Sequence, residues 1–180
     1  MEKKWADITP YATLLMEILS PYCTLLCTAG SYARMCPTVG DLELVALLPK
    51  ENRTKAGMAL MEVARICKGT FNATARYVCL SLKENSLQVD LFLPTETDFY
   101  RQLAIRTGPA EYSKRIAVAW VKMGWVGTSE GLRLREECKE TKSGWEPLNL
   151  VSPTLPPAWK GEPDFFEWLG MPYVLLKERI

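Results

Sequence analysis

The sequence contains no histidine, and this absence excludes several classes of catalyst. Hydrolases built on Ser-His-Asp or Cys-His arrangements need an imidazole as general base. Metalloproteases with the HExxH motif, His-ligated zinc deaminases and two-Cys-two-His fingers need one as a metal ligand. Any catalysis by this chain must therefore use carboxylates, lysine, tyrosine, cysteine or hard metal ions.

The cysteines lack the CxxC spacing of a zinc ribbon, since they are scattered at positions 23, 27, 36, 67, 79 and 138. This scatter predicts reduced, mostly buried thiols in a cytosolic protein. The start of the chain, MEKKWADITP, has no apolar core of a signal peptide. No stretch approaches the ~18 uninterrupted apolar residues of a transmembrane helix. We therefore expect a cytoplasmic protein without a membrane segment.

The 180 residues predict one domain, or one domain with a small appendage. Hydrophobic residues make up 48% and charged residues 24%, as in ordinary soluble globular proteins. The net charge is only +1, which neither demands nor excludes nucleic acid as a partner. The basic excess is local, because residues 101–142 carry nine basic and five acidic side chains.

The pattern of apolar residues predicts helices and strands that do not strictly alternate. Helices are expected at 6–19, 51–67, 95–106, 110–123 and 164–169, the third opened by a capping box of Thr95 and Asp98. Strands are expected at 22–29, 41–48, 74–82 and 87–93, with further pieces near 131–135 and 144–148. A turn is expected at 30–34, a hairpin loop at 83–86 and a loop at 151–161. This mixture favours the α+β class with a mixed or antiparallel sheet.

Three acidic residues fall on two of the predicted strands. Asp41 and Glu43 are two residues apart, so both side chains point to one face. Asp90 stands among Val, Leu and Phe, where a carboxylate is costly to bury without compensation. If the two strands are neighbours, the three carboxylates converge into an oxygen-rich site that suits two Mg²⁺ ions for phosphoryl transfer. An Asp-x-Glu pair is also common on a solvated strand face, and Asp90 is also compatible with an exposed edge.

A Gly-Ser turn precedes the acidic pair. Gly30 and Ser31 offer backbone N–H groups and a hydroxyl, and Arg34 follows three residues later. Such groups suit a triphosphate.

This arrangement resembles the signature of family X DNA polymerases, the polymerase beta-like nucleotidyltransferases. The resemblance covers roughly residues 20 to 175. It is carried by Gly30-Ser31-Tyr32-Ala33-Arg34, Gly40-Asp41-Leu42-Glu43, Val89-Asp90-Leu91-Phe92, Thr107-Gly108 with the helix that follows, and the ending Leu169-Gly170-Met171-Pro172-Tyr173.

The resemblance implies a nucleotidyltransferase palm at 1–106 that holds the metals. It also implies a small C-terminal α/β, thumb-like subdomain at 107–180 that contacts the nascent base pair. The N-terminal lyase and helix-hairpin-helix domains of cellular members are missing, and the length resembles minimal viral or phage members. A viral protein of this kind would act as a monomer in the host cytoplasm.

The implied activity is the addition of dNMP to the 3′-hydroxyl of a DNA primer, for repair or gap filling. Asp41, Glu43 and Asp90 would be catalytic and hold two Mg²⁺ or Mn²⁺ ions, with Asp90 accepting or orienting the proton of the 3′-hydroxyl. The implied partners are deoxynucleoside triphosphates and primer-template or gapped DNA. The implied nucleotide-binding residues are Gly30, Ser31, Arg34, Gly40, Ile105, Arg106, Thr107, Gly108, Ser113 and Lys114, and the implied DNA contacts are Lys122, Arg133 and Arg135.

The sequence departs from the family pattern at several positions. Glu43 replaces the usual second aspartate, and its extra methylene can shift a metal ligand by about an ångström, enough to cost ~10²-fold in rate. Ala33 and Gln88 replace basic residues, Ile105-Arg106 replaces an aromatic pair that screens the sugar, and Ala117 replaces an arginine that touches the template.

These departures keep two other readings open. The chain is also compatible with a nucleotidyltransferase for a small molecule, an RNA end or a protein hydroxyl, which Glu43, Ala117 and the near-zero charge favour. A third reading is a nucleotide-binding or nucleic-acid-binding module whose metal site has decayed.

Overall fold

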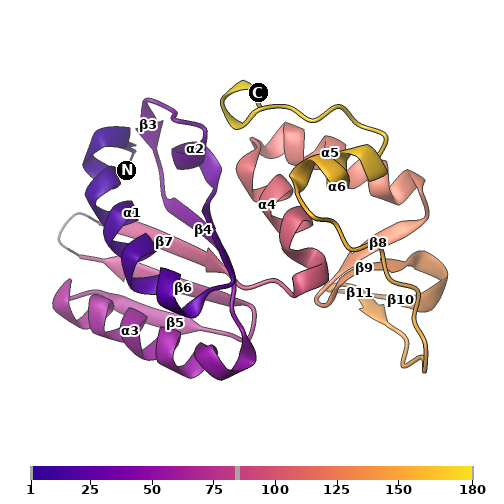
Figure 1. Cartoon of the computed structure of the whole chain (residues 1–180), viewed down its shortest axis with the longest axis horizontal. Coiled ribbons are helices and arrows are strands. Elements are labelled where there is room, and N and C mark those ends of the chain that lie inside the picture. The colour runs from indigo at the N-terminus through magenta and orange to yellow at the C-terminus, as the bar shows by residue number, and fades with distance from the viewer. Residues whose placement is uncertain (1, 84–85, 180) are drawn as a thin grey trace.

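The computed structural model describes residues 2–83 and 86–179, and the predicted α+β class is confirmed (Figure 1). The helices are α1 (Trp5–Leu19), α2 (Gly30–Ala33), α3 (Arg53–Ile66), α4 (Phe99–Thr107), α5 (Ala110–Lys122) and α6 (Glu162–Trp168). The strands of the larger sheet are β2 (Leu25–Thr28), β4 (Leu42–Leu47), β5 (Thr70–Ala73), β6 (Tyr77–Leu82) and β7 (Leu87–Phe92). The others are β1 (Lys3–Lys4), β3 (Thr38–Val39), β8 (Trp125–Thr128), β9 (Gly131–Leu134), β10 (Cys138–Thr141) and β11 (Gly144–Pro147).

The larger sheet is mixed, with strand order β2-β4-β7-β6-β5. Strands β4 and β7 run parallel at its centre, and the other pairs are antiparallel. Helices α1 and α3 cover one face, where their apolar side chains pack against alternate residues of β4, β6 and β7. Helix α4 covers the opposite face through Phe99 and Leu103, which pack against Val45.

The alternation along β4 and β7 decides which side chains face α4. Leu42 and Leu44 point into the core beneath α1 and α3. The intervening residue Glu43 therefore faces α4, as Val45 does two residues later. In β7 the same alternation points Leu87, Val89 and Leu91 toward α1 and α3, and it leaves Asp90 on the α4 side.

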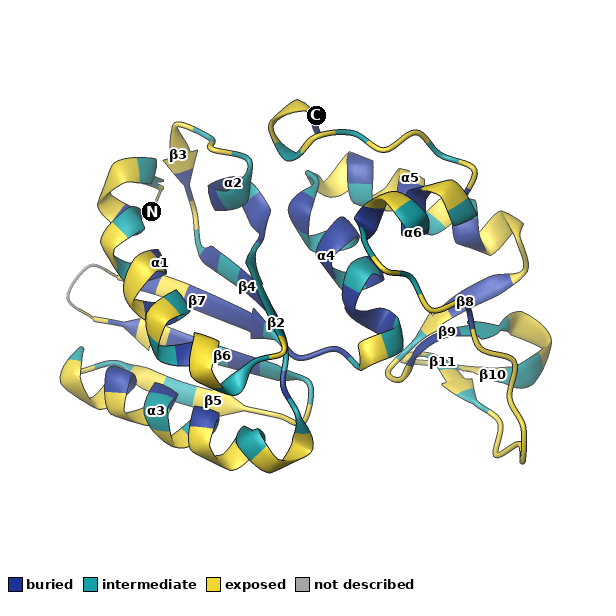
Figure 2. Ribbon diagram, in the orientation of Figure 1, coloured by how far each residue is buried: buried dark blue, intermediate teal, exposed yellow. Residues whose placement is uncertain are grey.

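The C-terminal part is built around a second core of aromatic side chains. A four-stranded sheet of order β10-β11-β8-β9 lies beside helices α4, α5 and α6 (Figure 1). Ala104 on α4 packs with Ile116 on α5 and with Phe165 and Phe166 on α6. Helix α4 therefore contributes to the cores on both of its sides, and buried residues recur along it (Figure 2). The predicted division after residue 106 falls at the end of this shared helix and stays a prediction.

Several local expectations need correction. Residues 30–34, expected as a turn, form the short helix α2, whose first residue Gly30 has φ +64°. The expected capping box is wrong, because α4 follows a 3₁₀ turn at Glu96–Asp98 and no side chain caps it. Strands β5, β8 and β10 and the pair β1–β3 were not expected, and the strand expected from residue 74 begins at Tyr77. The hairpin of β6 and β7 is confirmed by the pairing of Leu82 with Leu87, although residues 84 and 85 of its loop lie outside the described part.

The structure also bears on the predictions about the thiols and about membrane segments. All six cysteines are free, but they are half-buried rather than mostly buried. Within the described ranges, none of the helices combines the length and the hydropathy needed to cross a membrane.

Candidate active site

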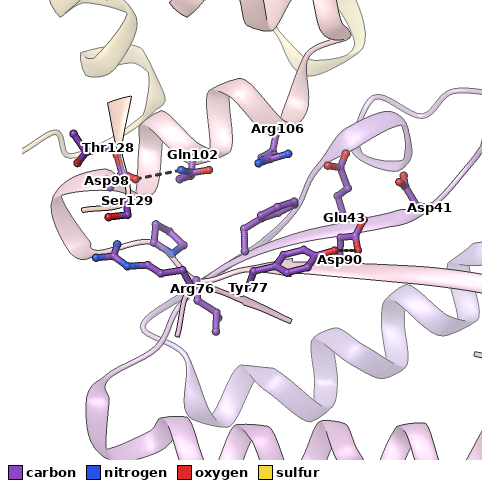
Figure 3. Close-up of a pocket in the computed structure, with 13 residues that line it drawn as sticks. Asp41, Glu43, Arg76, Tyr77, Asp90, Asp98, Gln102, Arg106, Thr128 and Ser129 are labelled. Carbon is purple, nitrogen blue, oxygen red and sulfur yellow. Dashed lines mark hydrogen bonds between the residues drawn. The ribbon is translucent and has the colours of Figure 1, made fainter. Parts of the chain in front are cut away.

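A cavity of about 610 Å³ opens between the α4-facing side of the large sheet, α4 itself and the turn between β8 and β9 (Figure 3). Three carboxylates line one end, an arginine, an amide, hydroxyls and a fourth carboxylate line the other, and Arg106 lies between the two ends (Figure 3). The polar lining residues are Asp41, Glu43, Arg76, Tyr77, Asp90, Asp98, Gln102, Arg106, Thr128 and Ser129.

The three acids that the sequence singled out lie together in this cavity. Strands β4 and β7 are adjacent and parallel, and their register sets Glu43 directly opposite Asp90. Asp41 lies just before the first residue of β4 and lines the same cavity. The structure thus places the three carboxylates in one cavity, while their roles as metal ligands and catalysts stay predictions.

Asp90 is 8% exposed, and its burial is compensated by two hydrogen-bond donors. The hydroxyl of Tyr77 donates to Oδ1 at 2.6 Å, and the amide of Gln88 donates to both carboxylate oxygens at 3.0 Å. The bond to Asp90 and burial raise the pKa of Tyr77. A carboxylate held from two sides keeps one orientation, which a ligand or base at this position needs.

The surroundings of Glu43 disfavour its charged form. Its pKa is raised from 4.5 to about 7, first by burial and then by the charges of Asp41 and Asp90, and Arg106 and Arg34 partly offset these causes. Burial and the charge of Asp90 also raise the pKa of Asp41. A cation placed among these side chains would relieve that repulsion.

Gly30 packs closely against the side chain of Glu43. A Cβ atom at this position would stand 2.2 Å from Glu43 Oε2, and the φ of +64° also disfavours any side chain. The backbone conformation therefore favours glycine here, and a side chain at this position would displace the end of the Glu43 side chain.

The rest of the predicted triphosphate group lies beside the cavity rather than in its lining. Arg34 donates from Nη1 to the carbonyl oxygen of Thr107 at 2.6 Å, which ties α2 to the end of α4. Ser31 is half-buried on α2, and Gly40 is exposed. Arg34 nevertheless lies near enough to Glu43 to lower its pKa.

The residues at the end of α4 that were predicted to contact the sugar point to different places. Arg106 lines the cavity, with its guanidinium carbon 3.8 Å from the centre of the Phe92 ring. Ile105 turns away and packs against the C-terminal aromatic core. Thr107 is buried and donates its hydroxyl proton to the carbonyl of Leu103, and Gly108 lies against Tyr112, where a Cβ would clash.

The predicted base-pair residues on α5 lie outside the carboxylate cavity. Ser113 Oγ donates to the carbonyl of Ile105 at 2.6 Å. Lys114 is exposed and pairs with Glu111 at 2.7 Å. Lys114 and Lys122 line a separate open groove along α5, which Val118 and Met123 share.

The other two predicted DNA contacts are not gathered with Lys122. Arg133 pairs with Glu130 at 3.1 Å, and its side chain is only 11% exposed. Arg135 lies 5.6 Å from the centre of the Trp145 ring. The structure therefore does not bring Lys122, Arg133 and Arg135 into one cavity.

The sequence predicted no functional role for Tyr77, for Gln102 or for the residues that line the far end of the cavity. The register of the β6–β7 hairpin could have found Tyr77, because Cys79 lies opposite Asp90 and residue 77 shares its face. Gln102 is one turn from Arg106 on α4, but only the packing of that helix on the sheet shows which face borders the acids.

The chemistry of the three acids fits hard divalent cations, which prefer oxygen ligands. Within the ranges 2–83 and 86–179, however, no group of three or more His, Cys, Asp or Glu side chains is arranged to hold a metal ion as the side chains stand. The donors are therefore of the right type, and their side chains must rotate toward one another to coordinate an ion.

No protein-family model and no curated protein sequence matches this chain.

Proposed function

We propose that the chain is a nucleotidyltransferase of the family X DNA polymerase type, which adds dNMP to a primer 3′-hydroxyl. One observation carries the proposal: Glu43 and Asp90 are register partners on parallel strands, Asp41 lines the same cavity, and Gly30 of the Gly-Ser pair touches Glu43. The palm-like organisation of residues 1–106 belongs to the same proposal.

The acids of the cavity and the residues around them would divide this reaction between them. Asp41, Glu43 and Asp90 would hold two Mg²⁺ ions, which when bound stabilise the attacking and leaving oxygens of an in-line displacement. Asp90, fixed by Tyr77 and Gln88, would accept the proton of the 3′-hydroxyl on a free carboxylate lone pair. Arg34 would present its remaining N–H groups to the triphosphate next to Ser31.

The exposed groove along α5 supplies a candidate surface for the nucleic acid. It contains Lys114 and Lys122, whose side chains reach solvent. Their ammonium groups suit phosphates, with the affinity falling steeply as salt rises.

The experiment is primer extension with Mg²⁺ or Mn²⁺ on gapped and on single-stranded DNA. Template-directed addition of one or more nucleotides supports the proposal. No addition on either DNA at millimolar metal and nucleotide contradicts it.

A second candidate is nucleotidyl transfer to a different acceptor, such as a small molecule, an RNA end or a protein hydroxyl. The ion pairs of Lys114 and Arg133 favour it, because each lowers the positive charge that these predicted contacts offer to nucleic acid. Transfer of a labelled nucleotide to such acceptors, without primer extension, would select this candidate. Absence of transfer to every acceptor would favour the third reading, a binding module whose metal site has decayed.

A further inference from the structure

Two polar atoms without hydrogen-bond partners lie one helical turn apart on α4. Gln102 Oε1 and Arg106 Nε are both buried, and neither has a partner within the part of the chain that the structure describes. Both residues line the carboxylate cavity (Figure 3). One atom is an acceptor and the other a donor, and residues four apart on a helix are neighbours. A rotation of the Arg106 side chain toward Gln102 would therefore satisfy both atoms at once.

Among the described residues, Arg106 has no directional partner at its Nε atom, but its charge acts on a neighbouring acid. Its guanidinium stacks on Phe92, and no acidic group of the described ranges lies within ion-pair distance of it. Its positive charge still acts on Glu43, and Figure 3 shows Arg106 between Gln102 and Glu43 along the cavity. The second nearby cation, Arg34, is committed to the carbonyl of Thr107.

We propose that Arg106 is the counter-ion of Glu43 in the cation-free protein, and that it moves to Gln102 when a divalent cation binds among the three carboxylates. Arg106 is thus a positioning residue that sets the affinity of the site for metal. The inference rests on the proposed function, because it takes Asp41, Glu43 and Asp90 as the groups that meet the cation.

The physical reason is competition between charges of the same sign. A divalent ion among the carboxylates repels a guanidinium in the same cavity, and it makes that guanidinium unnecessary as a counter-ion. Gln102 Oε1 offers the displaced Nε–H an acceptor inside the same cavity, so Arg106 need not enter solvent. Its release also leaves a cation beside the site where the triphosphate is proposed to bind.

The test is calorimetric titration of Mn²⁺ into the metal-free full chain without nucleotide. Arg106→Gln should bind Mn²⁺ about 3–10-fold more tightly than the wild type, because a competing charge is gone. Arg106→Lys, which keeps the charge, should stay within about twofold of the wild type. Gln102→Leu should bind about 2–3-fold more weakly, since Arg106 loses its alternative acceptor.

Arg135→Gln is the matched control, because Arg135 also stacks on an aromatic ring but lies in the C-terminal sheet region. It should leave the Mn²⁺ affinity unchanged, and circular dichroism checks the fold of each variant.

The outcomes separate the inference from the proposed function. If Asp90→Asn abolishes Mn²⁺ binding while Arg106→Gln binds no more tightly than the wild type, the counter-ion role is overturned and the metal site stands. An unchanged affinity in Gln102→Leu overturns the movement to Gln102. If the wild type itself binds no Mn²⁺ at millimolar concentration, both the metal site and the inference fall.

Discussion

At the scale of single residues, Glu43 is a carboxylate whose charged form is disfavoured by its surroundings. It is enclosed by β4, α2 and α4, and it lies beside two other acids. Its folded pKa of about 7 exceeds the ordinary value of 4.5, so the folded protein binds this proton more tightly than the unfolded chain does. The contribution to stability is therefore complete below pH 4.5 and is lost as the pH rises through about 7.

We therefore predict that the metal-free protein is less stable at pH 8 than at pH 5, by on the order of 2 kcal/mol from this group. Urea unfolding in the presence of a chelator measures this difference. Glu43→Gln, which cannot ionise, should show a smaller fall over the same interval. Glu62→Gln, on the exposed face of α3, is the control and should keep the wild-type fall. Identical pH profiles for Glu43→Gln and the wild type would contradict the electrostatic account.

The sequence was sufficient to predict the acids of the site, but it was not sufficient to predict which residues of α4 lie next to them. The two-residue spacing of Asp41 and Glu43 predicts a common face whatever surrounds the strand. Asp90 required only that two strands be adjacent. Gln102 and Arg106 meet the acids through the packing of a helix on a sheet, and no local pattern encodes that contact.

At the scale of elements, α2 is pressed against the edge of the acidic site. The contact is made by a glycine in the left-handed region, with Glu43 where a side chain would be. Gly57 in the middle of α3 is a matched contrast, because a Cβ there meets nothing within 4 Å.

We predict opposite effects for the same substitution at these two glycines. Gly30→Ala should lower the free energy of unfolding by roughly 1–3 kcal/mol through backbone strain and displacement of Glu43. Gly57→Ala should raise it by about 0.5–1 kcal/mol, because alanine loses less backbone entropy in a helix. Urea unfolding followed by circular dichroism measures both. A Gly30→Ala protein as stable as the wild type would show that α2 does not press on the site.

The elements that sequence reasoning missed are short or depend on distant contacts. Helix α2 has four residues and begins with a glycine, which locally looks like a turn. Strands β8 and β10 have four residues each, and β10 consists of Cys, Lys, Glu and Thr without an apolar alternation. Pairing with β11 and β9, rather than local preference, makes them strands.

At the scale of the whole molecule, the end of the chain is bound to the C-terminal core by a buried ion pair. Arg179 donates from Nη1 and Nη2 to the two oxygens of Glu162 on α6, each at 2.9 Å. Its side chain is fully buried and lies 5.4–5.7 Å from the centres of the Tyr112, Phe166 and Tyr173 rings. This contact closes the segment after α6 over α5 (Figure 1).

We predict that Arg179→Met costs about 3–5 kcal/mol, because it leaves the Glu162 carboxylate buried without a partner. The double variant Arg179→Met with Glu162→Gln should recover part of that loss, since the remaining amide is neutral. Thermal or urea unfolding of the two variants measures the difference. Equal losses in the single and double variants would contradict the role of the uncompensated charge.

The mixed order of helices and strands predicted the class of the fold. It did not predict that α4 contributes to two cores, because its buried side chains lie on two faces rather than one stripe. Arg101 and Asp98 form an ion pair, and their side chains are only 6% and 4% exposed. In the sequence, such charged residues look like surface residues. They are covered by elements distant in the sequence: Gly131 of the β8–β9 hairpin packs against Asp98, and Trp120 of α5 lies beside Arg101.

The central claim is that Asp41, just before β4, Glu43 on β4 and Asp90 on β7 form the site of nucleotidyl transfer. Single-nucleotide insertion on gapped DNA with Mg²⁺ or Mn²⁺ tests it most directly, comparing the wild type with Asp41→Asn, Asp90→Asn and the exposed control Asp7→Asn. We predict metal-dependent insertion by the wild type and by Asp7→Asn, and a loss of at least about 10²-fold in both site variants without loss of fold. Insertion at near wild-type rate by Asp90→Asn would contradict the account.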